Sequence, residues 1–262
     1  MEVFLTLYCN PNWQSALENQ QFATFEQIWD SPIDWIDEPN RNRGGWSGVG
    51  CIQLLNDGQP ITLYVKKQQN HVSRSLLHPF KGEPTFAKEF KVIRYLSAHG
   101  VITPQVVFFG QRSVAAGQQA ILITENLAGF QALDQITRSA MSLLAQRKLI
   151  AKVAQAVRSM HALGIQRRAL YPKHVFVKST GECVEVGFID LEKSRRMVFA
   201  PLQALSDLVT FNYRTADWGL RYRLYFFKKY FSIKQLDKFY KIVCGWIAYK
   251  TQQKQHQWNG KK

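Results

Sequence analysis

Apolar and polar residues alternate along the first half of the chain in a pattern that predicts β-strands. Ile61–Lys66 alternates like a half-buried strand that ends in a lysine. The preceding Asn56-Asp57-Gly58 has the composition of a tight hairpin turn and joins this strand to the apolar run Cys51–Leu55. Val106–Gly110 and Ala120–Thr124 indicate two further strands.

Two helices are expected from apolar residues at helical spacing. The first begins at Thr85, which can cap it, and ends at Gly100 and Pro104. Its apolar positions are Phe86, Phe90, Ile93 and Leu96. The second is a long periodic segment of roughly Ser139–Leu163.

Length and composition suit a globular protein with a full core. The chain has 262 residues, and 46% of them are hydrophobic. Its four cysteines have no C-x-x-C spacing, which predicts reduced thiols and neither a disulfide framework nor a zinc site. The start, Met1–Tyr8, lacks the basic region of a signal peptide, and no window reaches the ~20 apolar residues of a membrane span. We therefore expect a cytoplasmic protein, soluble or peripheral at a membrane.

The net charge of +15 predicts anionic partners, because charge governs association and not fold. Basic and aromatic residues interleave most densely in Arg214–Lys241. Such a segment is typical of a helix that docks on a membrane surface. The default interpretation is an ordinary helix pair with aromatics in the core and lysines in water, because surface helices are normally amphipathic. No nucleic-acid partner is expected, because no reader motif accompanies the charge.

A glycine cluster precedes the first predicted strand. In Arg43-Gly44-Gly45-Trp46-Ser47-Gly48-Val49-Gly50, the backbone amides of Gly44, Gly45, Gly48 and Gly50 could lie against phosphates without side-chain obstruction. The order of the glycines is not G-x-G-x-x-G, and a plain turn would look similar.

The lysine that ends the second strand matches the phosphate-pairing lysine of protein kinases. We choose Lys66 over Lys67, whose side chain must point to the opposite face of the strand. Glu89, in the first predicted helix, is the expected partner of Lys66. Thr124-Glu125-Asn126 is expected to form a hinge whose backbone receives adenine, with Glu125 as the binding residue.

Downstream, Met160–Asp190 has the layout of a kinase catalytic loop without its aspartate. Arg167-Arg168-Ala169-Leu170 stands where kinases carry H-R-D-L, and His174 stands at the asparagine position. Asp190-Leu191-Glu192 stands for Asp-Phe-Gly, whose aspartate holds magnesium. Asp190 and His174 are therefore the candidate metal ligands, and with Lys66 and Glu89 the candidate catalytic residues.

Each of these residues also has an ordinary structural interpretation. Asp190 could cap the next segment, and His174 could be a hydrogen-bonded histidine at a strand start. His161 is expected to pack or to hydrogen-bond within the loop frame. Asp207, in a helical segment Leu202–Val209, is expected to tie the loop backbone in place, as in kinase-like folds.

Taken together, these motifs resemble the InaA-type branch of the lipopolysaccharide kinase (Kdo/WaaP) family over about residues 40–230. The resemblance is carried by the run from Arg43 to Val49, by His78–Phe90, by Leu170–His174 and by Ile189–Arg196. It implies an α+β, protein-kinase-like bilobal fold, with an antiparallel sheet plus helix in the N-lobe and a mainly helical C-lobe. It also implies ATP and Mg2+ as cofactors and phosphorylation of inner-core sugars at the cytoplasmic face of a Gram-negative inner membrane. Ala169 departs from the family, whose sugar kinases keep aspartate there.

The expected organisation has four parts: an N-terminal extension (1–35), an N-lobe (36–126), a C-lobe (127–250) and a disordered polar tail (251–262). Two functions remain open. One is an ATP-dependent kinase acting on a lipopolysaccharide-core sugar or a related small molecule. The other is a pseudokinase, a nucleotide-binding module that regulates envelope or acid-stress functions without turnover. The sequence names no acceptor and no oligomeric state.

Overall fold

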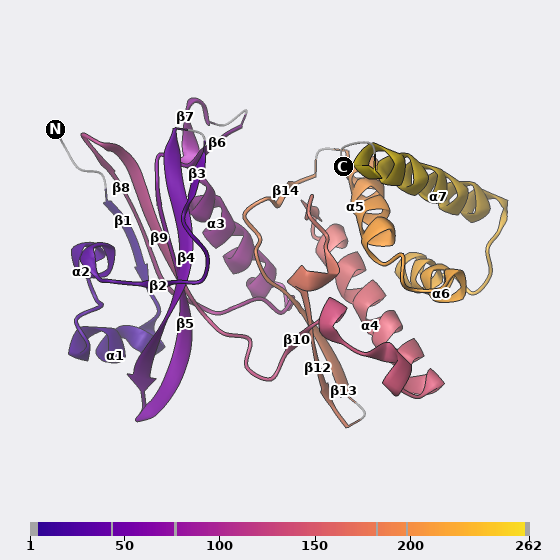
Figure 1. Ribbon diagram of the computed structural model, residues 1–262, viewed down its shortest axis with the longest axis horizontal. Coiled ribbons are helices and arrows are strands. Elements are labelled where there is room, and N and C mark those ends of the chain that lie inside the picture. Colours follow the sequence, from indigo (N-terminus) through magenta and orange to yellow (C-terminus); the bar gives the residue numbers. More distant parts are fainter. Residues whose placement is uncertain (1–4, 43, 76–77, 182, 198, 260–262) are drawn as a thin grey trace. The chain divides into compact units, whose positions relative to one another are not determined.

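The computed structural model describes residues 5–42, 44–75, 78–181, 183–197 and 199–259 (Figure 1). The chain divides into two compact units, which are considered separately. The first unit comprises Met1–Tyr95 and Pro104–Leu127, and the second comprises Leu96–Thr103 and Ala128–Lys262.

The first unit is built on a seven-stranded antiparallel sheet with the order β1-β8-β9-β5-β4-β2, in which β3 also pairs with β4. Its strands are β1 (Leu5–Cys9), β2 (Asp34–Trp35), β3 (Asn40–Asn42), β4 (Gly45–Asn56), β5 (Gln59–Gln69), β8 (Val106–Val114) and β9 (Gly117–Glu125). β6 (Val72–Ser75) and β7 (His78–Pro84) form a separate hairpin. The turn expected between β4 and β5 is present, with Asp57 and Gly58 both in the left-handed region as a tight hairpin requires.

Helices cover both faces of this sheet (Figure 1). α1 (Gln14–Asn19) and α2 (Phe25–Asp30), with the 3-10 turn Pro11–Trp13, lie on one face, and α3 (Thr85–Ala98) lies on the other. Trp13, Leu17 and Phe25 are buried against Leu63 and Val65 of β5. Residues 1–35 are thus part of the first unit, since they supply β1 and one wall of its core.

The second unit is mainly helical. Its helices are α4 (Leu143–Ala162), α5 (Ala200–Arg214), α6 (Leu220–Phe231) and α7 (Lys238–Asn259). Its strands are β10 (Gln131–Ala132), β12 (Val175–Thr180) and β13 (Cys183–Phe188) in one sheet, with β11 (Ile165–Gln166) and β14 (Arg195–Arg196) as a pair. Short 3-10 turns lie at Leu133–Gln135, Arg138–Ala140 and Pro172–His174.

Two helix boundaries differ from expectation. α4 begins after Ser142, whose side chain accepts from the Ala145 N–H, so Ser139 lies in the preceding 3-10 turn. α7 runs to Asn259, so residues 251–259 are helical and the prediction of a disordered tail is wrong for them. Thr251 explains the difference, because it is buried and receives a hydrogen bond from Asn212 of α5.

The basic, aromatic segment divides between two helices. Phe226, Phe227 and Tyr230 of α6 are buried, as in an ordinary amphipathic helix. On α7, Phe239 and Ile242 are each 65% exposed. Within the described residues, no helix combines the length and the apolar content that crossing a bilayer requires. Membrane docking therefore stays a prediction.

Candidate functional site

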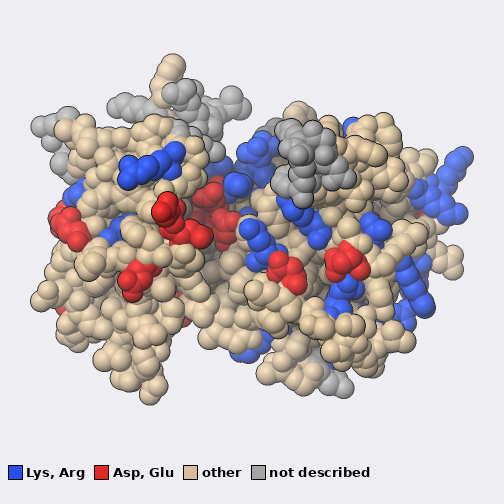
Figure 2. Space-filling view, in the orientation of Figure 1, with Lys and Arg blue, Asp and Glu red and all other residues tan. Residues whose placement is uncertain are grey.

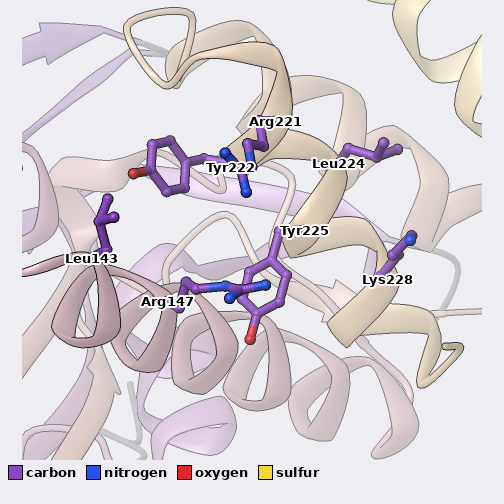
Figure 3. Close-up of a pocket in the computed structure, with 7 residues that line it drawn as sticks. All are labelled: Leu143, Arg147, Arg221, Tyr222, Leu224, Tyr225 and Lys228. Carbon is purple, nitrogen blue, oxygen red and sulfur yellow. The ribbon is translucent and has the colours of Figure 1, made fainter.

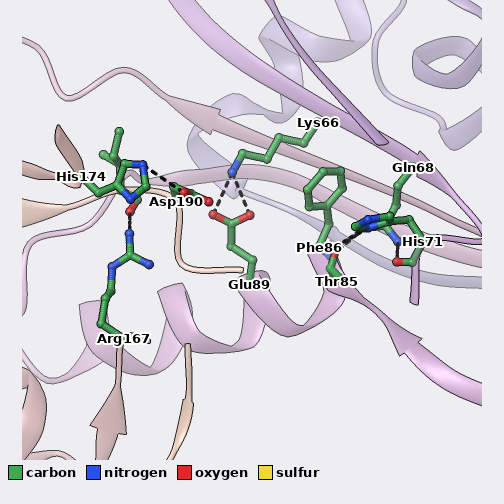
Figure 4. A network of polar contacts seen from close by, with 10 residues as sticks. Lys66, Gln68, His71, Thr85, Phe86, Glu89, Arg167, His174 and Asp190 are labelled. Carbon is green, nitrogen blue, oxygen red and sulfur yellow. Dashed lines mark hydrogen bonds and ion pairs between the residues drawn. The ribbon is translucent and has the colours of Figure 1, made fainter. Parts of the chain in front are cut away.

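A buried ion pair joins the strand and the helix of the first unit that the sequence singled out. Nζ of Lys66, on β5, lies 2.8 Å from both carboxylate oxygens of Glu89, on α3 (Figure 4). The Glu89 side chain is 2% exposed and the Lys66 side chain 13%. The expected pairing is present, and it leaves the ammonium group nearer to solvent than the carboxylate that holds it.

A second polar group fixes the start of α3 on the same strand. Gln68 is fully buried, and its Oε1 accepts hydrogen bonds from the Phe86 N–H and the Thr85 hydroxyl, both at 2.9 Å. Its Nε2 donates to the carbonyl of His71, and the His71 ring contacts Thr85. Gln68 thus satisfies an N–H of the first helical turn. Because it shares a strand face with Lys66, it sets the position of α3 from which Glu89 reaches the lysine.

Lys67 occupies the opposite face, as strand alternation requires. Its Nζ donates to the carbonyls of Trp29 and Ser31, at 3.0 and 2.8 Å, under the α2 side of the sheet. Burial lowers the pKa of Lys67 to about 8, although the carboxylate of Asp30 opposes the shift. Lys66, and not Lys67, is therefore the lysine that pairs with Glu89.

The glycine cluster does not form an open loop. Gly45, Gly48 and Gly50 lie inside β4. This strand pairs with β5 from Trp46 onward, and its other edge pairs with β3 at Gly45–Ser47 and with β2 at Gly50–Cys51. A Cβ on Gly48 would lie 2.6 Å from the ring of Trp35, and one on Gly50 would overlap Ile33. The absence of side chains at these glycines leaves room for the segment that contains Ile33 and Trp35 and covers the strand. Their prediction as phosphate-binding residues is therefore not supported. The reason is a long-range packing contact that a glycine spacing does not reveal.

Among the glycines of the cluster, Gly44 is the one with open space beside its backbone. It lies between β3 and β4, with φ +77°, and a Cβ there would meet nothing within 4 Å. Arg43, which precedes it in the glycine cluster, lies outside the described residues.

The expected hinge ends the last strand of the first unit. The N–H groups of Glu125 and Asn126 donate to the carbonyls of Gln105 and Thr62, so neither is available to an adenine ring. The Glu125 side chain accepts from Nε1 of Trp13 at 2.7 Å. An adenine contact by Glu125 would use its carbonyl oxygen, which can accept two hydrogen bonds.

In the second unit, one buried aspartate organises the loop. Asp207, fully buried on α5, accepts from the backbone N–H groups of Arg167 and Arg168, at 2.6 and 2.8 Å. These bonds hold Arg168 in the left-handed region, at φ +61°. The expected tie between Asp207 and the loop backbone is confirmed.

His161 completes this support from α4. Its Nε2 lies 3.2 Å from Asp207 and its Nδ1 2.7 Å from the hydroxyl of Tyr230 on α6. Burial and the nearby Asp207 raise the pKa of Tyr230 to about 12. The phenol therefore stays protonated. A carboxylate accepts, so Nε2 of His161 donates to Asp207, and Nδ1 in that tautomer can accept from the Tyr230 hydroxyl. Tyr230 had no signal in the sequence beyond its place in an aromatic run.

The loop keeps its frame without a base. Ala169, at the aspartate position, is 2% exposed. Arg167 is fully buried and its guanidinium donates to the carbonyl of Ile189, the residue before Asp190 (Figure 4). Arg167 therefore links the loop to the strand end, and its permanent charge prevents it from acting as a base.

His174 and Asp190 lie together, with Nε2 3.3 Å from a carboxylate oxygen. Burial, and then the positive charges of Arg167 and Lys173, lower the pKa of His174 to about 3, so its imidazole is neutral at pH 7. Asp190 adopts φ +54° and its side chain is 35% exposed. A neutral imidazole and an accessible carboxylate are both groups that can donate a lone pair to a divalent cation.

These donors fit a magnesium ion that shares its shell with a nucleotide. Within the described ranges, no group of three or more His, Cys, Asp or Glu side chains forms a closed metal cage. Mg2+ is usually held by one or two carboxylates, with waters and substrate phosphates completing the octahedron. Asp190 fits that role, and His174 is a less usual second ligand.

Comparisons with known proteins place these motifs in a family. Residues 26–241 match the model of the lipopolysaccharide kinase (Kdo/WaaP) family. Protein InaA of Escherichia coli (strain K12) is 37% identical over 180 residues, which cover 67% of this chain and 81% of that protein. Lipopolysaccharide core heptose(I) kinase WaaP of Pseudomonas aeruginosa is 26% identical over 174 residues, 62% of this chain and 65% of that protein.

A solved structure shares the fold. WaaP in complex with acyl carrier protein matches with a TM-score of 0.69 at 21% identity, over 95% of this chain and 98% of that one. The expected α+β, protein-kinase-like fold is confirmed.

Proposed function

Because the chain belongs to the lipopolysaccharide kinase (Kdo/WaaP) family, we propose that it uses ATP and Mg2+ to phosphorylate an inner-core sugar of lipopolysaccharide or a related small molecule. The Lys66–Glu89 ion pair carries the proposal, since phosphoryl transfer in protein kinases requires such a pair in place. This activity belongs in the cytoplasm, where ATP is available, with peripheral contact to the inner membrane that carries the acceptor.

Each unit would contribute its own groups. In the first, Lys66 would bind phosphate oxygens, the Gly44 turn would approach the phosphates, and Glu125 would meet adenine. In the second, Asp190 and His174 would hold the metal. Bound Mg2+ neutralises charge on the β- and γ-phosphate oxygens.

Removal of the acceptor proton is the weak step. The acceptor oxygen bonds to the γ-phosphorus as the bond to ADP breaks, and the hydroxyl proton needs an acceptor. Ala169 supplies none, and His174, with a pKa near 3, is a weak base. A positioned base contributes roughly 10²- to 10⁴-fold, whereas most of the catalysis comes from positioning and charge stabilisation. We therefore expect turnover to be slow, and Glu192 is the remaining candidate for the base.

A second function is favoured by the same loop. Asp207 and His161 preserve the loop frame although its base is missing. A frame kept without a base is what a nucleotide-binding pseudokinase needs, with regulation in place of turnover.

Incubation with radiolabelled ATP, Mg2+ and core-oligosaccharide acceptors separates these functions. The kinase proposal predicts label on the acceptor above a sample without acceptor. Nucleotide binding without transfer across the acceptor panel supports the pseudokinase. Absence of both binding and transfer contradicts the two proposals together.

A further inference from the structure

Three cationic side chains line a small cavity in the second unit, between the start of α4 and one face of α6 (Figure 3). The cavity measures about 240 Å³. Its lining comprises Arg147, Arg221 and Lys228 together with two tyrosines, Tyr222 and Tyr225, and two leucines. No residue of the lining is acidic.

Regular helical spacing builds the cavity. Leu143 and Arg147 lie one turn apart on α4, and Arg221, Tyr225 and Lys228 recur at intervals of four and three on α6. Each of the two helices buries its other face in the core of the unit; on α6 that face includes Phe226 and Phe227. The walls are therefore carried on packed elements and not on loops.

The positive charge in the cavity lacks compensation by the protein. Among the residues that the structure describes, Arg147, Arg221 and Lys228 form no ion pair with a carboxylate, whereas nearby Arg138 pairs with Asp217 at 3.0 Å. Like charges gathered at one site repel each other. A bound anion would relieve that repulsion.

Charge is also distributed unevenly between the units. The second unit has 24 Lys and Arg against 8 Asp and Glu, and the first has 10 against 11. On the face shown in Figure 2, Lys and Arg side chains gather over α4–α7 of the second unit. The whole positive excess therefore lies in the unit that contains the cavity, and its field attracts anions there.

The two tyrosines give the cavity an apolar wall and orient one of its cations. The guanidinium of Arg147 lies 5.2 Å from the ring centroid of Tyr225 (Figure 3). Stacking on a ring favours one orientation of an arginine that is otherwise exposed. Two arginines and a lysine match the two or three oxygens of a phosphate group better than the single edge of a carboxylate.

We propose that this cavity binds a phosphate ester whose organic part packs against Tyr222 and Tyr225. Its volume is below the ~300 Å³ of small drug-sized sites, so the ligand is a small phosphorylated sugar or the phosphate-bearing head group of an anionic lipid. Arg147 is about 20 Å along α4 from His161, which supports the loop. The phosphate bound here is thus not the one transferred, and the inference does not depend on phosphotransfer.

Calorimetric titration of the full chain tests the inference with five probes. These are inorganic phosphate, a hexose 6-phosphate, the unphosphorylated hexose, and phosphatidylcholine vesicles with or without phosphatidylglycerol. Arg147→Gln/Arg221→Gln is compared with Lys234→Gln/Lys241→Gln, which removes the same charge from exposed positions outside the cavity.

We expect the hexose phosphate or the phosphatidylglycerol vesicles to bind, and the hexose and the neutral vesicles to fail. The cavity variant should weaken binding about tenfold or more, and the control less than about twofold, because distant surface charges are screened. Tyr225→Leu should reduce the preference for the organic ester over inorganic phosphate. The phosphorylated probe whose binding is weakened in the cavity variant shows whether the natural ligand is a sugar phosphate or a lipid head group.

If both double variants weaken binding equally, the binding is due to the general surface charge and not to the cavity, and the inference is overturned. So would the absence of binding by every phosphorylated probe at millimolar concentration. Lys228→Gln alone, which removes a half-buried side chain from the helix surface, provides a second cavity variant if the double variant does not fold.

Discussion

The two units use buried carboxylates in different ways. In the first, Glu89 holds another side chain, Lys66, whose ammonium group is a candidate ligand for phosphate. In the second, Asp207 holds backbone, the N–H groups of Arg167 and Arg168, and the side chain that would do chemistry is absent at Ala169. The first arrangement leaves a cation partly exposed to a ligand, whereas the second stabilises the fold whether or not catalysis occurs. A retained loop frame is therefore weaker evidence for activity than a retained ion pair.

The largest effect is expected from removing the carboxylate that holds the loop. Asp207→Ala should cost about 3–6 kcal/mol of unfolding free energy, because two N–H groups lose a charged acceptor worth roughly 1.5–3 kcal/mol each. Urea denaturation followed by circular dichroism measures this loss. Asp217→Ala, at an exposed ion pair of the same unit, is the control and should change stability by less than about 1 kcal/mol. Similar losses in both variants would mean that Asp207 does not organise the loop.

The ion pair of the first unit should govern nucleotide binding. At about 100 times its dissociation constant, magnesium ATP should stabilise the wild type by about 2.7 kcal/mol. Lys66→Met/Glu89→Gln should abolish most of that gain. The double variant is preferable to Lys66→Met alone, which would remove the ammonium partner of a buried carboxylate and cost about 3–5 kcal/mol by itself.

A thermal-shift titration measures this gain. Lys67→Met is the matched control, since Lys67 points to the other face of the same strand and should leave the ATP response intact. A full ATP response in the double variant would remove Lys66 from the nucleotide site.

Restoring the missing base at Ala169 tests the second unit. Ala169→Asp should raise turnover up to roughly 10²-fold, the lower bound for a positioned base, if the second unit still forms an acceptor site. Ala169→Asn is the control, because it has nearly the same shape and cannot accept the proton in the same way. Radiolabel transfer that rises with Asp, and disappears on adding Asp190→Asn, supports the kinase. Unchanged ATP binding with no transfer in any variant supports the pseudokinase.

A substitution in β4 tests whether its glycines are required for packing or for phosphate binding. Gly48→Ala should destabilise the protein by about 1–3 kcal/mol, because its Cβ would press on the ring of Trp35, while the affinity for ATP stays unchanged in the folded protein. Urea denaturation and nucleotide titration measure the two quantities. A loss of ATP affinity without a loss of stability would restore the phosphate-binding interpretation.

The smallest effect concerns Lys67 and pH. Its folded-state pKa of about 8 lies below the ordinary value of 10.5, so the unfolded state binds more protons between these two pH values. Unfolding free energy should therefore rise with pH from 8 to 10.5 in the wild type relative to Lys67→Met. Denaturation curves at pH 7, 8.5 and 10 measure the difference. Parallel pH profiles would show that Lys67 keeps its ordinary pKa.

Local pattern was enough to place the ion pair and most of the loop. The alternation of β5 separated Lys66 from Lys67, because successive side chains on a strand point to opposite faces. The spacing of Phe86, Phe90 and Ile93 defined the helix that carries Glu89. The spacing from Ala169 to His174 and Asp190, read with a family resemblance, located the loop and the absence of its base.

Tertiary structure decided what lies against each element. The spacing of the β4 glycines resembles a phosphate loop, but Trp35 and Ile33 pack against these glycines in the fold. Gln68 has a role because the start of α3 lies within hydrogen-bonding distance of it. Residues 251–259 are helical because Thr251 meets α5. The cation-lined cavity likewise needs α4 and α6 side by side. Periodicity in the sequence determines which face of an element is apolar, but contacts between residues far apart in the chain determine which segment covers that face.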